Sequence, residues 1–315
     1  MTQVSQAPWG EVPGQGVVHL WLLQSPQLQV EILTLGATIK SVFSRGRDGR
    51  SADVVLGYDH LQAGYLSDRR YLGATVGRVA NRIAKGLFVV DGVQYKLDTN
   101  NGPNAIHGGL QGFSKALWRA EAVDAGVQLS LTSPDGDQGY PGELQVSLTY
   151  TLKGAPDIYD HQVSISAQWY LPVDDTSIPT GDIRPVEGTL FDLRKPVLLG
   201  PRLKELPGPG FDHNFCLCAS KDVWKERRAA RVVHPASGRV LEVWTSQPGL
   251  QFYTANYLDG SVVGKGGVPY GKHSSFCLET QNWPDAVNQP TFPNCLLQAG
   301  EQYHHVTRLS FTTAP

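Results

Sequence analysis

Short runs in which apolar and polar residues alternate recur along this chain, and they limit the fold classes that it can adopt. In residues 144–152, LQVSLTYTL, every second residue is Leu, Val or Tyr, and Gln, Ser and Thr lie between them. Similar runs occur at 27–32, 127–132, 163–168, 239–245, 250–256 and 306–312. Successive side chains of a β-strand point to opposite faces, so this period of two predicts strands.

Turn-forming residues separate these runs. The chain has 34 Gly and 21 Pro among 315 residues, and they are scattered rather than clustered. Helical periodicity is weak, and the best helix candidate is residues 221–232, KDVWKERRAARV. Many short strands with turns between them predict an all-β sandwich or barrel. No repeat and no shift of composition marks a boundary, so a single domain over residues 1–315 is the simplest organisation.

Composition and charge exclude several classes of partner. Hydrophobic residues make up 41% and charged residues 18% of the chain, which is typical of a globular protein. With a net charge of −2 and no block of Lys and Arg, a nucleic-acid partner is not expected. We expect no secretory signal and no membrane span, because no apolar run approaches about 20 residues. Four Cys without CxxC spacing favour free thiols in a cytoplasmic protein without a metal.

Two polar clusters in the first half of the chain are candidate binding segments. Residues 77–83, GRVANRI, contain Asn81 and Arg82, whose planar groups suit hydroxyl or carboxylate ligands. Residues 103–109, PNAIHGG, place His107 beside two glycines, where a ligand can approach the backbone closely. A basic surface turn and a structural hydrogen-bonding histidine are the alternative interpretations.

Two further clusters lie in the second half of the chain. Residues 211–218, FDHNFCLC, place Asp212 before an apolar strand, although Asx residues there often only form turns. Residues 277–290, CLETQNWPDAVNQP, place Glu279 at the end of an apolar run, where partial burial would tune a general base. A strand-end Glu paired with an arginine is the alternative. Together the clusters suit a neutral polyhydroxylated ligand, and the sequence shows no phosphate cradle or nucleophile elbow.

These four stretches, in this order, resemble the aldose 1-epimerase (galactose mutarotase) family, and the likeness is greatest to its animal members. The stretches SPDGDQGYPGEL, YLPVD, IPTGDI, FDLRKPV and QFYTANYLDG are also similar to the family, so the resemblance covers nearly the whole chain. It implies a large single-domain antiparallel β-sandwich. The implied reaction interconverts the α and β anomers of galactose and glucose, with a base at the anomeric hydroxyl and an acid at the ring oxygen.

The resemblance also implies a role for individual residues. Glu279 matches the general base, which would explain a carboxylate at the end of an apolar run. The implied substrate contacts are Asn81, Arg82, His107, Asp212 and Gln251. The implied partner is a small sugar bound by a monomer, with no cofactor, no metal, no nucleic acid and no membrane.

One part of the family pattern is absent from this chain. The family has a second active-site histidine, the general acid, in a stretch similar to TNHSYFNLAG after the strand that here ends at Leu152. In this chain LKGAPDIY leads directly from Leu152 to Asp160, so the resemblance implies an internal deletion near 153–160. His161 matches a family histidine beyond the deletion and is not the missing acid. Such a deletion removes part of a sheet and exposes a strand edge.

Three functions stay open at this point. The first is an aldose 1-epimerase, fully active or impaired, in which His107 is the first candidate for a substitute proton donor. The second is a non-catalytic sugar-binding protein of the same fold, although a pure binder has no need of Glu279. The third is a glycoside hydrolase or lyase that uses Asp212 and Glu279 as its carboxylate pair.

Overall fold

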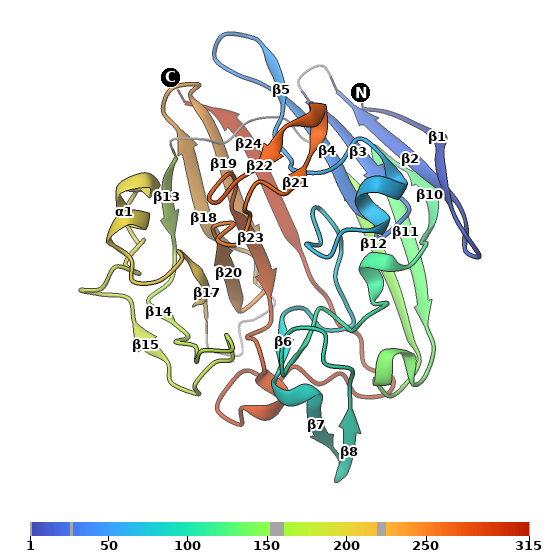
Figure 1. Ribbon diagram of the computed structural model, residues 1–315, viewed down its shortest axis with the longest axis vertical. Helices are drawn as coiled ribbons and strands as arrows, with labels where there is room; N and C mark the ends of the chain where they lie inside the picture. The colour runs from blue at the N-terminus through green and yellow to red at the C-terminus, as the bar shows by residue number, and fades with distance from the viewer. Residues whose placement is uncertain (1, 26–27, 152–160, 219–224, 315) are drawn as a thin grey trace.

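The computed structural model of the chain describes residues 2–25, 28–151, 161–218 and 225–314. Every strand pairing among these residues is antiparallel (Figure 1). None of the described helices is long and apolar enough to cross a membrane. The implied deletion near 153–160 lies outside the described residues.

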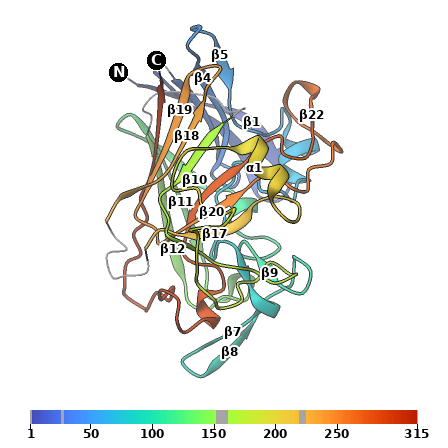
Figure 2. The same cartoon turned by 90° about the vertical axis from the view of Figure 1, so that its left-hand side faces the viewer.

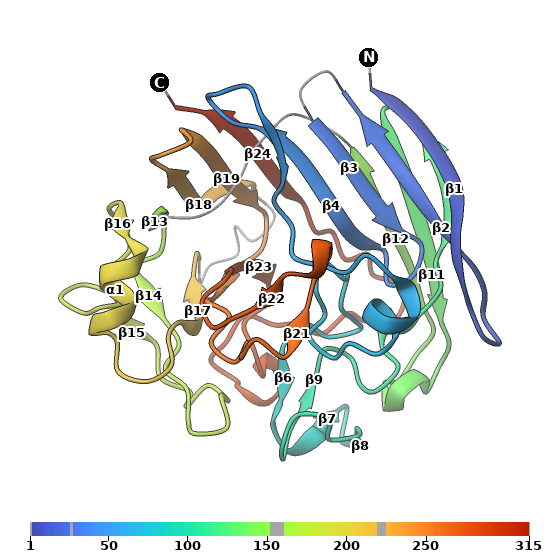
Figure 3. The ribbon, with the colours of Figure 1, turned by 45° about the horizontal axis from the view of Figure 1, so that its top comes forward.

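Two sheets pack face to face in the first half of the chain. The larger sheet contains, in spatial order, β1 (Gln3–Val12), β2 (Gly16–Gln24), β3 (Leu28–Leu33), β4 (Thr38–Arg45) and β5 (Ser51–Asp53). The smaller sheet contains β10 (Arg119–Val123), β11 (Gly126–Ser133) and β12 (Leu144–Thr151). Their shared core includes Trp21, Ile32, Trp118 and Leu129, because alternate residues of each strand point inward. Figure 3 shows β11 and β12 behind the curved sheet of β1–β4.

Two five-stranded sheets form the second layered pair. The outer sheet contains, in order, β16 (Val197–Leu198), β13 (Gln162–Ile165), β18 (Arg227–His234), β19 (Arg239–Thr245) and β24 (Thr307–Thr313). The inner sheet contains β15 (Arg184–Pro185), β14 (Trp169–Tyr170), β17 (Asp212–Cys216), β20 (Gly249–Tyr253) and β23 (Cys277–Gln281). The core between them includes Phe211, Phe215, Val243 and Phe252. The prediction of an antiparallel β-sandwich is confirmed.

Smaller elements complete the described part of the chain. Three two-stranded ribbons join β6 (Arg82–Ile83) to β9 (Ala105–Ile106), β7 (Leu87–Val90) to β8 (Val93–Lys96), and β21 (Val262–Val263) to β22 (Pro269–Tyr270). The helical elements are α1 (Leu199–Glu205), the π-helical turn η1 (Leu61–Leu66) and the short turns η2 (Ala84–Gly86), η3 (Phe113–Lys115), η4 (Asp137–Gly139), η5 (Lys265–Gly267) and η6 (Ala286–Asn288). The β7–β8 hairpin projects from one end of the molecule (Figure 2).

Each predicted strand run overlaps a strand, although the runs 163–168 and 250–256 extend three residues beyond β13 and β20, and the predicted helix does not agree with the structure. The run 239–245 coincides with β19, and the run 144–152 coincides with β12 within one residue. The helix predicted at 221–232 is wrong in its described part, because Arg227–His234 forms β18. Ala230 and Val232 are buried in the core while Arg231 between them is half-buried, and that alternation belongs to a strand.

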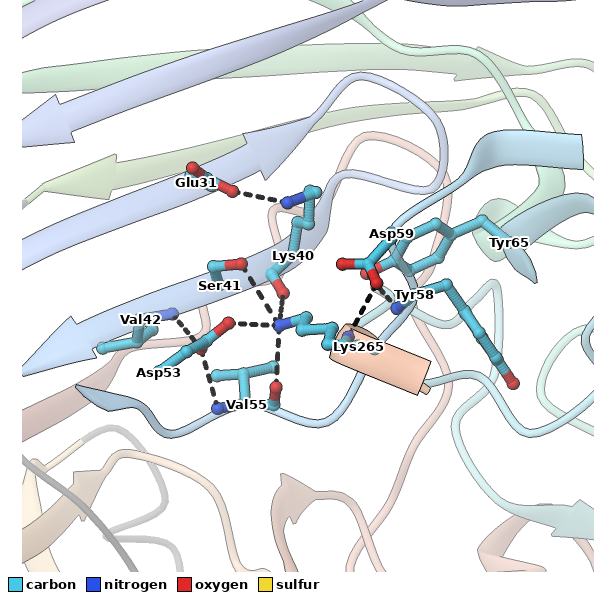
Figure 4. Close-up of polar contacts among 12 residues, drawn as sticks. Glu31, Lys40, Ser41, Val42, Asp53, Val55, Tyr58, Asp59, Tyr65 and Lys265 are labelled. Carbon is cyan, nitrogen blue, oxygen red and sulfur yellow. Dashed lines mark hydrogen bonds and ion pairs between the residues drawn. The ribbon is translucent and has the colours of Figure 1, made fainter. Parts of the chain in front are cut away.

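A half-buried lysine joins the connection between β20 and β23 to the first sheet (Figure 4). Lys265 begins η5, and its side chain and that of Asp53 are each 17% exposed. The Lys265 ammonium, which has three N–H donors, lies within hydrogen-bonding distance of four oxygens: the Asp53 Oδ2 at 2.6 Å, the Val55 carbonyl at 2.7 Å, the Ser41 hydroxyl at 3.1 Å and the Lys40 carbonyl. A charge with four oxygen partners tolerates burial that an unpaired ammonium would not.

Candidate active site

Three adjacent strands, β17, β20 and β23, present polar side chains on one face. Their register places Gln251 opposite both Asn214 and Glu279, so these three side chains share a face. The next register pair, Phe215 and Leu250, points to the other face and is fully buried in the core. In these strands the residues on this face alternate with residues on the core face, and Glu279 lies on the polar face of β23.

Hydrogen bonds tie the polar face together. Gln251 Nε2 donates to Asp212 Oδ1 at 2.7 Å. Gln281, two residues after Glu279 and on the same face, donates from Nε2 to Asn214 Oδ1 at 3.1 Å and to Gln251 Oε1 at 3.4 Å. Asn214, Gln251 and Gln281 are all buried. Buried amides with satisfied partners hold the face in one arrangement.

A second group of polar side chains comes from the β6–β9 ribbon. Arg82 pairs with Ile106 across the ribbon, which brings Asn81 next to His107. The Asn81 backbone N–H donates to His107 Nδ1 at 3.1 Å, and Asn81 Nδ2 donates to Gln281 Oε1 at 3.5 Å. Asn81 and His107 both have positive φ, at 65° and 51°. The left-handed conformation is uncommon for residues other than glycine, and such strained residues cluster at functional sites.

The Arg82 guanidinium is oriented by two amide oxygens. Its Nε donates to Asn101 Oδ1 at 2.8 Å, and Nη1 contacts Asn81 Oδ1 at 3.4 Å. Burial raises the pKa values of Glu279 and Asp212 and the Arg82 charge opposes that rise, whereas at His107 burial lowers the pKa and the Arg82 charge adds to the lowering. Arg82 therefore lies close to all three titratable groups of the site.

His107 is neutral and accepts a hydrogen bond at Nδ1. Burial, with a smaller contribution from the Arg82 charge, lowers its pKa to about 3. Because Nδ1 accepts the Asn81 N–H, the single proton of the neutral ring resides on Nε2. The Tyr71 ring packs edge to face against the imidazole, with the ring centroids 4.8 Å apart.

Glu279 is a half-buried carboxylate whose pKa lies near neutrality. Burial raises its pKa from 4.5 to about 7; the neighbouring Asp212 carboxylate adds to this effect and Arg82 opposes it. Within the described ranges, no hydrogen bond or ion pair engages the Glu279 side chain. A carboxylate with these properties can accept and return a proton at neutral pH.

The raised pKa of Glu279 predicts a pH-dependent gain in stability for Glu279→Gln. The folded wild type binds the Glu279 proton more tightly than the unfolded chain does. Proton binding therefore stabilises the wild type fully below pH 4.5, and this stabilisation is lost as pH rises through about 7. At about pH 8 we expect the variant to gain about 1–3 kcal/mol of unfolding free energy over the wild type. Chemical denaturation at about pH 8 and pH 4 tests this. An equal difference at both pH values would contradict it.

Asp212 is also affected by its surroundings. Burial raises its pKa, while the Arg82 charge and the hydrogen bond from Gln251 partly offset that rise. The two carboxylates thus differ: Asp212 is held by an amide, whereas the Glu279 oxygens are open to a ligand. That difference suits one carboxylate for binding and the other for proton transfer.

All six predicted site residues line one cleft. Glu279, Asn81, Arg82, His107, Asp212 and Gln251 border a space of 2960 Å³ that also reaches β12 and β24. The sequence did not indicate a role for Gln281 or for Tyr71. Gln281 could have been found from its spacing of two residues from Glu279 within a strand, whereas no local signal marks Tyr71.

Known proteins resemble this chain over its full length. A sequence model of the family described as Aldose 1-epimerase matches residues 19–156 and 153–310. The galactose mutarotase of Bos taurus is 52% identical over 346 aligned positions that cover 100% of both chains. The aldose 1-epimerase of Escherichia coli (strain K12) is 32% identical, with 95% of this chain and 96% of that protein covered. The crystal structure of the GalM/aldose epimerase homologue from C. elegans superposes with a TM-score of 0.84 at 26% identity, with 100% of each chain covered.

Proposed function

This chain belongs to the aldose 1-epimerase family, and we propose that it interconverts the anomers of galactose and glucose with Glu279 as the general base. It is an isomerase. The 52% identity to a galactose mutarotase over the full length of both chains supports the reaction. The observation that carries the assignment of the base is the Glu279 carboxylate: it is half-buried, its pKa is about 7, and it lines the cleft.

The proposed reaction begins with proton transfer from the anomeric hydroxyl to Glu279. The C1–O5 bond of the sugar breaks as the C1 oxygen becomes a carbonyl, and O5 takes a proton from solvent water to become the C5 hydroxyl, which gives that proton back to solvent when the ring closes. Rotation about the C1–C2 bond presents the other face of the aldehyde, and ring closure returns the proton from Glu279 to the new anomeric oxygen. A base whose pKa is close to the working pH serves both directions.

The remaining polar groups are proposed to position the sugar. Asp212 and Gln251 lie hydrogen-bonded side by side and offer acceptors and donors for sugar hydroxyls. The oriented Arg82 guanidinium and the Asn81 amide supply further contacts. The Nε2–H of His107 is proposed to donate to the ring oxygen, where it stabilises the negative charge that develops as the ring opens.

We further propose that this chain lacks the segment with the second histidine of the family. The alignment with the bovine relative has 346 positions for a chain of 315 residues, so about 31 positions have no counterpart here. The two stretches matched by the family model meet at residues 153–156, which supports a deletion at that point. A general acid typically contributes about 10²–10⁴-fold, so we expect a slower enzyme rather than an inactive one.

The finer properties are also proposals. A single domain over residues 1–315 is supported by family-model matches that together cover most of the chain. A cytoplasmic monomer is proposed from the family resemblance, and the four free cysteines fit a reducing compartment. The reaction transfers protons and opens and closes the sugar ring without any net change of oxidation state, so it requires no cofactor.

Proton NMR tests the reaction and separates it from hydrolysis. Saturation of the α-anomer signal of galactose should be transferred to the β-anomer signal faster with the protein than without it, and glucose should behave alike. Methyl β-D-galactoside has no free anomeric hydroxyl, so it should stay unchanged. Release of methanol from this glycoside would overturn the assignment in favour of a glycoside hydrolase.

The pH dependence of the rate should report the charges around Glu279. The base must be ionised, so kcat/KM should fall as pH falls through about 7 in the wild type. Asp212→Asn removes a negative charge near Glu279 and should move the acidic limb of the pH–rate profile to lower pH. Arg82→Gln removes the opposing positive charge and should move that limb to higher pH. Initial rates across pH measure both shifts, with the exposed Glu121→Gln as control. Limbs that do not move, or that move in the same direction, would contradict this electrostatic arrangement.

A further inference from the structure

The cleft that contains the site is larger than a monosaccharide requires. Its volume of 2960 Å³ exceeds the roughly 300–1,000 Å³ that is usual for small-molecule sites. The polar site residues occupy only one part of its wall. The rest is formed by β12 and by residues 295–309. A sugar in the site therefore leaves most of this space unfilled.

Two strand edges without a described neighbour border this space. β12 ends the three-stranded sheet and β24 ends the outer five-stranded sheet, and within the described ranges each pairs on one side only. The eight residues of β12 include no charged residue and no proline. Natural edge strands are usually protected by charges, prolines or bulges, so β12 has the properties of a strand that accepts another.

The wall of the cleft is apolar where these edges face it. Alternate residues of β12 are half-buried apolar side chains that pack on the first core: Leu144, Val146, Leu148 and Tyr150. Across the cleft Leu296, Leu297, Tyr303 and Leu309 are exposed. Four exposed large apolar side chains in one short stretch mark an interaction surface rather than an ordinary solvated face.

The aligned relatives indicate what such a surface takes. The bovine relative has about 31 positions without a counterpart here, and the two matched stretches of the family model meet at 153–156, directly after β12 ends at Thr151. We propose that the cleft between β12 and β24 is an acceptor for an extended polypeptide that pairs with the free edge of β12 and carries apolar side chains at alternate positions. The proposed occupant is a separate polypeptide with the sequence that the relatives have at the positions missing from this chain. This proposal rests on family membership and not on catalytic activity.

Binding of a synthetic peptide tests the proposal. The probe is a fluorescein-labelled peptide with the bovine sequence at the positions that this chain lacks, and fluorescence anisotropy follows its binding to the full chain. We expect saturable binding, no comparable binding of a scrambled peptide, and at least about tenfold weaker binding to Leu309→Lys, which places a charge in the apolar wall. Val89→Lys makes the same kind of change at an exposed apolar residue outside the cleft and should bind like the wild type.

Amide hydrogen exchange locates the bound peptide. Residues 144–151 should gain protection when the peptide binds, whereas β1, an edge strand of the first sheet, should not. No saturable binding, equal binding of the scrambled peptide or unchanged binding to Leu309→Lys would each overturn the proposal. Dimerisation of the chain alone that Leu309→Lys abolishes would replace the peptide by a second copy as the occupant. None of these readouts depends on epimerase activity, so failure of the proposed function is seen separately.

Discussion

Replacement of Glu279 by Gln should lower the catalysed rate of galactose mutarotation by about 10²–10⁴-fold. Gln has nearly the same shape as Glu and keeps hydrogen-bonding capacity, but its amide cannot accept the proton of the anomeric hydroxyl. The groups proposed to hold the sugar, Asp212, Gln251 and Arg82, are hydrogen-bonded to one another or to neighbouring amides rather than to Glu279. The substitution should therefore remove proton transfer and leave the binding groups in place.

Rate and affinity must be measured together to separate these effects. Polarimetry gives the catalysed rate after subtraction of the spontaneous one, and calorimetric titration with galactose gives the affinity. We expect a fall in kcat with an affinity within about threefold of the wild type, because a single hydroxyl contact is modest. Glu121→Gln, the same chemical change at an exposed residue of β10, should match the wild type. A Glu279→Gln protein that retains its rate would assign the base to another residue.

Replacement of Lys265 by Met should destabilise the fold by about 3–5 kcal/mol. The substitution keeps much of the side-chain volume but removes the cation, which leaves the Asp53 carboxylate buried without its ionic partner. The carboxylate Oδ1 also accepts the backbone N–H groups of Val42 and Val55, at 3.0 and 3.1 Å, so Asp53 cannot turn away to solvent without a further loss. Removing one partner of a buried ion pair lowers the free energy of unfolding more than removing both partners does.

Two control variants make this prediction specific. Arg184→Met breaks an ion pair with Asp182 in which the side chains are 58% and 56% exposed, so it should destabilise the fold far less than Lys265→Met. Adding Asp53→Asn to Lys265→Met removes the stranded charge and keeps an oxygen for the two N–H groups, so it should restore part of the stability. Urea denaturation measures all four proteins. A Lys265→Met protein no less stable than Arg184→Met would show that the buried pair does not stabilise the connection between β20 and β23.

The strands were predictable because the pattern that identifies them is local. In β11 and β12 every second residue faces the core, and the sequence shows that period directly. Residues 221–232 misled because Lys, Glu, Arg and Ala favour helices. Burial of Ala230 and Val232 against the second core outweighs that propensity in β18.

The site was predictable only in part from the residues themselves. Local sequence places Glu279 at the end of an apolar run, but it does not show that β6 lies beside β23, about 200 residues later. The Asn81–Gln281 hydrogen bond is such a long-range contact, and only the resemblance to a family connected its two segments. The free edge of β12 depends on how the sheets assemble, so no local pattern in the sequence describes the surface beside it.

Polarimetry of the wild-type chain is the most direct measurement. Fresh α-D-galactose is dissolved with and without the purified protein at neutral pH, and the optical rotation is followed to equilibrium. We expect the rotation to reach the same final value faster with protein, at a rate proportional to protein concentration. If a folded protein that binds galactose leaves mutarotation at its spontaneous rate, the central claim is contradicted. The chain would then be a sugar-binding protein on an epimerase fold.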